Sequence, residues 1–199
     1  MNTKLVYVVG PSGAGKDSVM DWLLSQPSLQ ESVHWATRDV TRAGHESSQR
    51  DRAVSAQAFA TLQAQGAYAL WWQANGLSYG VRHEVLAPLA QGQWLLINGS
   101  RRHLPTAAAQ YPGLTVLHIT ADAQLLRQRL MQRGREQAQA VKARLAQGAV
   151  VDMAAGFLTN GRLVQVLNNG RLEEAGRQAL AGLRSLPGWP EAGPLPSTS

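Results

Sequence analysis

Short, continuous apolar runs recur along this chain, and longer segments with apolar residues every three or four positions separate them. The runs are aliphatic and β-branched, which is typical of strands buried on both faces of a parallel sheet; they occupy residues 5–9, 33–37, 94–97, 114–119 and 163–167. The helical period predicts helices at residues 18–24, 55–65, 84–91, 103–110, 122–132, 136–147 and 171–186. Because strands and helices alternate, we expect an α/β fold of three layers on a five-stranded, mainly parallel sheet.

An insertion at about residues 40–90 interrupts this alternation, between the second and third strands of the sheet. Apolar segments at 68–73 and 77–81 flank Ala74-Asn75-Gly76, and Asn-Gly between such segments predicts a β-hairpin. We therefore expect the insertion to be a small region of its own.

Two further features of the insertion follow from local chemistry. Residues 41–53 are polar, charged and glycine-containing, which predicts a loop, and Ser55 can cap the helix that follows. Trp71 and Trp72 are adjacent in a predicted strand. Neighbouring side chains of a strand point to opposite faces, so at most one of these tryptophans faces a ligand.

Length and composition bound the class of protein. A chain of 199 residues suits one compact domain, which we place at residues 1–186. The last residues, 187–199, carry four prolines and end in Pro-Ser-Thr-Ser, which predicts a disordered tail. No apolar stretch approaches the roughly 18 residues of a membrane span, and no secretory leader is evident. With no cysteine to form disulfides, we expect a cytoplasmic protein.

The charge balance favours phosphate chemistry over nucleic-acid binding. The net charge is +6, and 16 of the 19 basic residues are arginine. These arginines are spread along the chain without a long basic run, so we expect neither a nucleic acid nor a membrane as partner. The fixed fork of donors on arginine suits a site that handles several phosphates.

A glycine-rich turn follows the first predicted strand and opens the first helix. It fits G-x-x-x-x-G-K-[ST] at every position but the last, where an aspartate stands. In such a turn the backbone N–H groups and the helix N-terminus face an anion, and the lysine reaches the β- and γ-phosphates of a nucleotide. The predicted ATP-binding residues are Gly10, Pro11, Ser12, Gly13, Ala14, Gly15, Lys16, Asp17 and Ser18, with Arg129 from a later helix.

Asp17 has two interpretations. The usual hydroxyl at this position binds Mg²⁺, and a carboxylate is also an oxygen ligand for that hard cation. The neighbouring strand ends in Asn98-Gly99-Ser100 without an acid, so the metal-binding carboxylate would have moved into the loop. Alternatively, Ser18 supplies the ligand and Asp17 only complements the helix dipole. We favour Asp17 as the metal ligand.

Candidate acceptor-binding residues lie in the insertion and at the carboxyl edge of the sheet. Ligands bind at that edge in α/β folds, and arginine pairs can clamp a phosphate. These candidates are Arg38, Arg42, Tyr79, Asn98, Ser100 and Arg101.

A second group of arginines surrounds Gly134. Arg129 and Arg133 are four apart on a predicted helix face, and Arg144 follows. Arginines around a glycine hinge suit a lid, at about residues 133–147, that closes over transferring phosphates. With Lys16, Arg133 and Arg144 are the expected catalytic residues. The histidines show no metal-ligand spacing, and His118 reads as a core residue.

The chain resembles the guanylate-kinase-like P-loop kinases over roughly residues 4–186. The shared motifs are "GPSGAGK" at 10–16, "TR" at 41–42, "YG" at 79–80, "RLMQRG" at 129–134, "ARL" at 143–145 and Asn168-Asn169. Within that group it looks more like the ribose 1,5-bisphosphate phosphokinases of phosphonate breakdown. Their marks here are "GPSGAGKDS" at 10–18, "VTR" at 40–42, "WQANGLSYGV" at 72–81, "INGSR" at 97–101, "HLP" at 103–105 and "RLMQRGRE" at 129–136.

This resemblance implies transfer of the ATP γ-phosphate to ribose 1,5-bisphosphate with Mg²⁺, giving 5-phosphoribosyl 1-diphosphate. It also makes Asp17 a match to the subfamily. Guanylate kinases carry an acid where Asn98 stands, and their "TTRxPRxGE" run is degraded here to "VTRAGHESSQRD" at 40–51, which favours a sugar phosphate over guanine. The alternatives are a guanylate kinase or another nucleoside monophosphate kinase, and a binding module without catalysis, against which Lys16 argues. Whether the protein forms a homodimer stays open.

Overall fold

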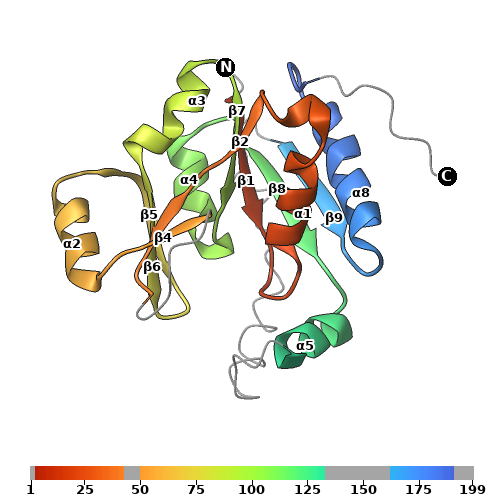
Figure 1. Ribbon diagram of the computed structural model, residues 1–199, viewed down its shortest axis with the longest axis horizontal. Coiled ribbons are helices and arrows are strands. Elements are labelled where there is room, and N and C mark those ends of the chain that lie inside the picture. Colours follow the sequence, from red (N-terminus) through yellow and green to blue (C-terminus); the bar gives the residue numbers. More distant parts are fainter. Residues whose placement is uncertain (1–2, 43–49, 133–161, 191–199) are drawn as a thin grey trace.

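The computed structural model describes residues 3–42, 50–132 and 162–190. Its centre is a five-stranded sheet in which every neighbouring pair is parallel (Figure 1). The spatial order is β2 (Val33–Trp35), β7 (Trp94–Asn98), β1 (Leu5–Val9), β8 (Thr115–Thr120) and β9 (Arg162–Leu167). The predicted five-stranded parallel sheet is confirmed. Its three central strands, β7, β1 and β8, are buried over almost their whole length because helices cover both faces.

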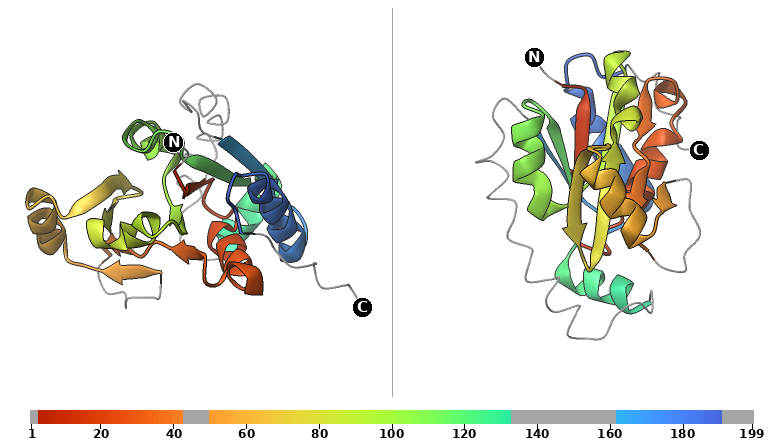
Figure 2. Two further views of the ribbon diagram at one scale, coloured as in Figure 1. Left: turned by 90° about the horizontal axis from the view of Figure 1, so that it is seen from above. Right: turned by 90° about the vertical axis from the view of Figure 1, so that its left-hand side faces the viewer.

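Helices lie on both faces of this sheet (Figure 2), and each face carries its own hydrophobic core. On one face, α1 (Lys16–Leu24) and α8 (Leu172–Arg184) pack together, with the ring of Trp22 lying against Gly176. On the other face lies α4 (Leu104–Gln110), preceded by the 3-10 turn η3 (Arg101–His103). Helix α5 (Ala123–Gln132) lies beyond the carboxyl end of β8, next to the phosphate loop. The predicted helix at 136–147 lies outside the described residues.

The insertion forms a second, four-stranded sheet. Its order is β4 (Asp51–Ala53), β3 (Arg38–Val40), β6 (Leu77–Arg82) and β5 (Tyr68–Ala74). The β5–β6 hairpin turns at Asn75 and Gly76, both with positive φ, as predicted. Helix α2 (Ala56–Ala64) follows β4, and the Ser55 hydroxyl caps it by accepting from Ala58 N at 3.1 Å. The 3-10 turn η2 (His83–Leu86) and α3 (Ala87–Ala90) lead back to the core.

One prediction for the insertion was wrong. Residues 41–53 were expected to be a loop, but residues 51–53 form β4, which pairs with β3 in parallel, with Arg38 opposite Asp51; residues 43–49 lie outside the described ranges. Each of these strands has three residues, too few for an apolar alternation to show. The pairing of β3 with β4 is stabilised by charged side chains such as Arg38 and Asp51, and not by a shared apolar face.

The insertion sheet has two chemically different faces. Asp39 points away from the core sheet and is 2% exposed. It accepts hydrogen bonds from Tyr68 Oη at 2.9 Å and Arg82 Nε at 2.7 Å, which compensates the buried charge. Burial, and then the hydrogen bond to Asp39, raise the pKa of the Tyr68 hydroxyl. Arg38 and Val40, which flank Asp39 in β3, point to the opposite face of the insertion sheet.

The packed domain extends further than the predicted boundary at Leu186. Trp189 is 6% exposed, and its ring lies 4.8 Å from that of Trp94, whose Nε1 donates to Gly188 O at 2.8 Å. The start of the expected tail is therefore part of the core; residues 191–199 lie outside the described ranges. Of the helices in the described ranges, none is long and apolar enough to cross a membrane.

Candidate active site

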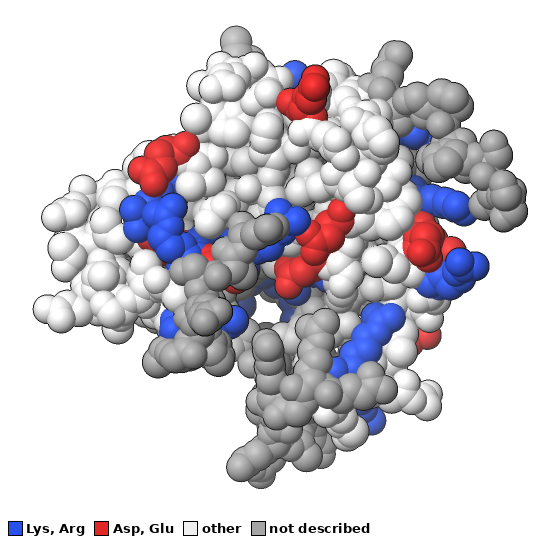
Figure 3. Space-filling model, viewed as in Figure 1, with Lys and Arg blue, Asp and Glu red and all other residues white. Residues whose placement is uncertain are grey.

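A pocket of about 660 Å³ lies between the carboxyl edge of the central sheet and the insertion sheet. The phosphate loop and the loop after β7 form one side of it, and the insertion forms the other. Basic side chains gather around this hollow on the face shown in Figure 3. The lining includes five basic side chains: Lys16, Arg38, Arg42, Arg101 and Arg102. Such a lining suits a ligand that carries several negative charges.

The phosphate loop has the backbone that its glycines predict. Gly10 has φ 153°, and a Cβ there would lie 1.9 Å from Ile119 O. Gly15 has φ 84°, and a Cβ there would lie 2.4 Å from Asn168 Nδ2. Asn168 is buried, and its Nδ2 donates to Ala14 O at 2.8 Å. The end of β9 therefore fixes the loop. A side chain at position 10 would clash with backbone, and one at position 15 would displace the Asn168 side chain and strain the positive φ.

Lys16 and Arg129 lie against this loop. Lys16 Nζ donates to Gly10 O at 3.0 Å and to Pro11 O at 3.3 Å. Arg129 Nη1 donates to Gly13 O at 3.4 Å from α5, whose Leu126 and Leu130 lie next to Gly13. Both cations are thus close to where the nucleotide phosphates bind in such a loop.

Asp17 and Asn98 are in direct contact. Asn98 Nδ2 donates to Asp17 Oδ1, and the backbone oxygen of Asn98 accepts from Arg38 Nη1 at 2.5 Å. Arg38 in turn holds Asp51, with Nε to Oδ1 at 2.9 Å and Nη2 to Oδ2 at 3.1 Å. A continuous chain of polar contacts therefore runs from the insertion to the phosphate loop.

The loop after β7 is held from below by Tyr7. A Cβ on Gly99 would lie 2.0 Å from Tyr7 Cζ, so the ring lies directly under the loop. The Tyr7 hydroxyl accepts from Ser100 N at 3.2 Å and lies 2.9 Å from His103 Nδ1. Burial raises the pKa of Tyr7 and lowers that of His103. Hydrogen bonds of the Tyr7 hydroxyl with Ser100 N and with His103 Nδ1 therefore fix the loop at both ends.

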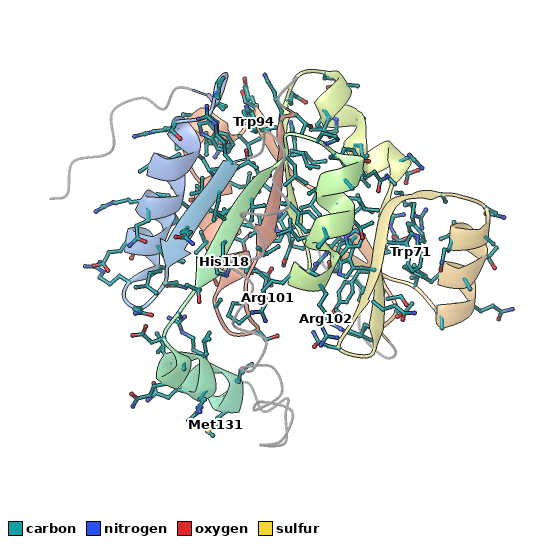
Figure 4. The ribbon with its side chains drawn as sticks, turned by 180° about the vertical axis from the view of Figure 1, so that it is seen from behind. Trp71, Trp94, Arg101, Arg102, His118 and Met131 are labelled. Atoms are coloured by element: carbon teal, nitrogen blue, oxygen red, sulfur yellow. The ribbon has the colours of Figure 1, made fainter. Side chains whose placement is uncertain are left out.

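Arg101 and His118 lie close together at the carboxyl edge of the sheet (Figure 4). His118 is 7% exposed. Burial, and then the charges of Arg101 and Lys16, lower its pKa. A neutral ring beside two cations leaves the positive charge of this region on Lys16 and Arg101.

The pocket brings together most of the predicted site residues. From the phosphate loop these are Gly10, Ser12, Lys16 and Asp17, and from the rest Arg38, Arg42, Tyr79, Asn98, Ser100 and Arg101. Ser18 is exposed and is not among the lining residues. Arg133 and Arg144 lie outside the described residues, as does the predicted lid.

Sequence reasoning did not select several residues at the pocket, among them Asp51, Trp72, Arg102 and Asn168. Asp51, Trp72 and Arg102 line the pocket, and Asn168 braces the phosphate loop. Trp72 lines the pocket and Trp71 does not, as their opposite orientations require. Asn168 directly follows a parallel strand, and this position could have marked it as a candidate. The carboxyl ends of parallel strands meet at the edge of the sheet where ligands bind.

Comparison with known proteins agrees with this geometry. No protein-family model matches the chain. Ribose 1,5-bisphosphate phosphokinase PhnN of Pseudomonas fluorescens (strain SBW25) is 45% identical over 172 residues, which is 85% of this chain and 88% of that protein. The protein of the same name from Rhizobium etli (strain CIAT 652) is 38% identical over 182 residues, 92% of this chain and 90% of that protein.

A solved guanylate kinase from Anaplasma phagocytophilum has a TM-score of 0.61 at 16% identity, over 91% of this chain and 84% of that one, which shows the fold. Guanylate kinase and this chain thus share an architecture. The two phosphokinases are similar to this chain in sequence over most of their length. The chain belongs to the ribose 1,5-bisphosphate phosphokinase family.

Proposed function

We propose that this protein transfers the γ-phosphate of ATP to the 1-phosphate of ribose 1,5-bisphosphate, giving 5-phosphoribosyl 1-diphosphate and ADP. An oxygen of the 1-phosphate attacks the γ-phosphorus while its bond to the β–γ bridging oxygen breaks. The observation that carries this proposal is one pocket in which the phosphate loop faces the basic groups Arg38, Arg42, Arg101 and Arg102. That arrangement suits an acceptor with phosphates of its own.

The reaction needs no strong general base, because a phosphate acceptor is already ionised at neutral pH. The two carboxylates of the described pocket lining, Asp17 and Asp51, are engaged with Asn98 and Arg38. Catalysis would then come from alignment and from neutralisation of charge on the transferring group. Lys16, with its mobile charge, neutralises the β- and γ-phosphates. Arg133 and Arg144 would close over them from the predicted lid.

The residues present fit a magnesium ion that arrives with ATP. Within the described residues there is no group of three or more His, Cys, Asp or Glu side chains, so a dedicated protein cage is not available there. Mg²⁺ is often held by one or two carboxylates together with substrate phosphates. Asp17 is the pocket carboxylate at the phosphate loop, and Asn98 Nδ2 orients it. Bound there, the cation would neutralise phosphate charge.

The acceptor pocket distinguishes this activity from that of a nucleoside monophosphate kinase. Asn98 offers an amide where guanylate kinases, which the chain resembles, carry an acid for guanine. Both carboxylate oxygens of Asp51 already accept hydrogen bonds from Arg38. These features favour a sugar bisphosphate over GMP.

The test is identification of the product by phosphorus NMR. Purified protein is incubated with ATP and Mg²⁺ and with ribose 1,5-bisphosphate, GMP or no acceptor. We expect a new diphosphate signal and one ADP per acceptor only with ribose 1,5-bisphosphate. Turnover of GMP alone would instead identify a nucleoside monophosphate kinase, and no turnover with any acceptor would favour a binding module.

A further inference from the structure

Arg102 lines the pocket with a guanidinium that no described part of the chain holds. It follows Arg101 in η3, and its side chain is exposed. Residues 3–42, 50–132 and 162–190 form neither a hydrogen bond nor an ion pair with that side chain. A guanidinium has five N–H donors in a fixed fork and a permanent positive charge. Within the described residues, these donors therefore remain available to a ligand in the pocket.

Two other basic groups of the pocket are already held in place. Arg38 donates from Nε and Nη2 to the carboxylate of Asp51 and from Nη1 to Asn98 O. Lys16 Nζ donates to two carbonyl oxygens of the phosphate loop. Both groups give the pocket positive charge from fixed positions, whereas Arg102 can still adjust to an anion.

The adjacent side chains of Arg101 and Arg102 lie toward different parts of the pocket. Arg101 lies close to His118, and its charge, with that of Lys16, lowers the pKa of that histidine. In Figure 4, Arg102 lies further from His118, toward the insertion hairpin. Arg102 and Trp72 line both this pocket and a second hollow of about 560 Å³ between β5 and α4. Arg102 therefore lies at the end of the pocket next to the hairpin.

The acceptor of the proposed reaction has a phosphate on each side of its sugar ring. The 1-phosphate must lie near the phosphate loop, because one of its oxygens attacks the γ-phosphorus of ATP. The sugar ring and C5 then separate the 5-phosphate from that loop. Ionised phosphate oxygens accept hydrogen bonds, and the fork of an arginine matches two of them at once. An available guanidinium on the hairpin side of the pocket fits both the place and the chemistry of the 5-phosphate.

We propose that Arg102 binds the 5-phosphate of the acceptor and so selects a sugar bisphosphate over a sugar 1-phosphate. This inference rests on the proposed function and names the residue that determines its acceptor specificity. Arg42, which lines the pocket two residues after β3, is the competing candidate. The other competing explanation is that Arg102 only adds to the positive field of the pocket.

The experiment measures kcat/KM with two acceptors, ribose 1,5-bisphosphate and ribose 1-phosphate, which lacks only the 5-phosphate. Wild type is compared with Arg102→Ala, Arg102→Lys and Arg42→Ala. The matched control is Arg177→Ala, because Arg177 is an exposed arginine on α8 outside the pocket lining. Loss of a hydrogen bond to a charged group lowers kcat/KM by about tenfold to a hundredfold.

We expect wild type to lose that factor when ribose 1-phosphate replaces ribose 1,5-bisphosphate. Arg102→Ala should lose it with the bisphosphate and should match wild type with ribose 1-phosphate, so that the preference for the bisphosphate disappears. Arg102→Lys keeps the charge without the fork and should recover only part of the preference. Arg177→Ala should behave as wild type with both acceptors.

Two results with the variants would overturn the inference. Equal losses of Arg102→Ala with both acceptors would show that Arg102 acts through the field of the pocket and not on the 5-phosphate. A preference that disappears in Arg42→Ala but persists in Arg102→Ala would assign the 5-phosphate to Arg42.

A binding measurement gives the same comparison without turnover. Ribose 5-phosphate is titrated calorimetrically into protein that holds a non-transferable ATP analogue. Its Kd should rise about tenfold to a hundredfold in Arg102→Ala, and an unchanged Kd would contradict the inference.

Failure of the inference and failure of the proposed function give different results with wild type. If wild type uses ribose 1-phosphate as well as ribose 1,5-bisphosphate, the inference is wrong and the proposed function stands. If wild type does not turn over ribose 1,5-bisphosphate at all, the proposed function itself fails.

Discussion

At the scale of single residues, positions 17 and 98 show an exchange of side-chain chemistry. The phosphate-loop pattern expects a hydroxyl after Lys16, and an acid commonly ends the neighbouring strand. Here the acid is Asp17 and the strand ends in the amide of Asn98, and the two are hydrogen-bonded. Relative to that pattern, the carboxylate stands at position 17, in direct contact with the side chain at the position where the acid is otherwise expected.

This exchange can be tested with the Mg²⁺ dependence of the reaction. Asp17→Asn should raise the Mg²⁺ concentration needed for half-maximal activity, because the charged oxygen ligand is lost. The double variant Asp17→Asn with Asn98→Asp returns a carboxylate to the same contact and should recover much of the affinity. Calorimetric titration of Mg²⁺ into protein with a non-transferable ATP analogue gives a readout independent of turnover. Identical Mg²⁺ curves for wild type and Asp17→Asn would instead favour Ser18 as ligand.

Of the pocket residues, Lys16 is the one whose replacement should lower kcat/KM most. Lys16→Ala removes a positive charge that follows the transferring phosphate, so kcat/KM should fall by at least about a hundredfold. Lys4→Ala is the control, because Lys4 Nζ donates to Gly92 O at an exposed position. An Lys16→Ala enzyme within about threefold of wild type would mean that the phosphate loop is not the catalytic cradle.

At the scale of elements, the loop after β7 is fixed by side chains from other segments. Tyr7 of β1 lies under Gly99, and its hydroxyl is hydrogen-bonded to His103 Nδ1 of η3. The predicted strand and helix around this loop were correct. Their spacing in the sequence gave no sign that Tyr7 joins them, because a tyrosine in an apolar strand has the same pattern as any core residue.

The carboxyl-terminal segment gives a second test at this scale. Trp189→Ala should lower the free energy of unfolding by about 3 kcal/mol, because a buried aromatic side chain is removed. Truncation after Leu186 should cost at least as much. The measurement is urea-induced unfolding followed by tryptophan fluorescence and circular dichroism.

The matched control is truncation after Pro190, which keeps Gly188 and Trp189. It should change the free energy of unfolding by less than about 0.5 kcal/mol. If removal of residues 187–199 proves as harmless as removal of 191–199, the contact between Trp94 and Trp189 contributes nothing to stability.

At the scale of the whole molecule, the pocket exists because two sheets face each other. The central sheet supplies the phosphate loop, and the insertion sheet supplies Arg38, Asp51 and Tyr79. Substrates bound in this pocket would therefore contact parts of the chain far apart in sequence, and their binding should stabilise the folded state as a whole.

A non-transferable ATP analogue and ribose 1,5-bisphosphate, each at about 100 times its Kd, should each add about 2.7 kcal/mol to the free energy of unfolding. For a domain of this size that is roughly 5–10 °C in Tm, measured by scanning calorimetry. Lys16→Ala should lose most of the shift due to the ATP analogue and keep that due to the sugar bisphosphate. A larger shift with GMP than with ribose 1,5-bisphosphate would contradict the proposed acceptor.

The sequence by itself determined the parallel sheet, the phosphate loop and most of the pocket residues. Apolar runs, a glycine-rich turn and strand ends are local features, and the physics that places them acts over a few residues. Only the tertiary structure decided the roles of Asp51 and Trp189 and the partner of Asn168. Asp51 belongs to a three-residue strand that its pairing with β3 defines, and Asn168 and Trp189 meet partners more than ninety residues away. Such contacts depend on how the sheets and helices pack, which no local period encodes.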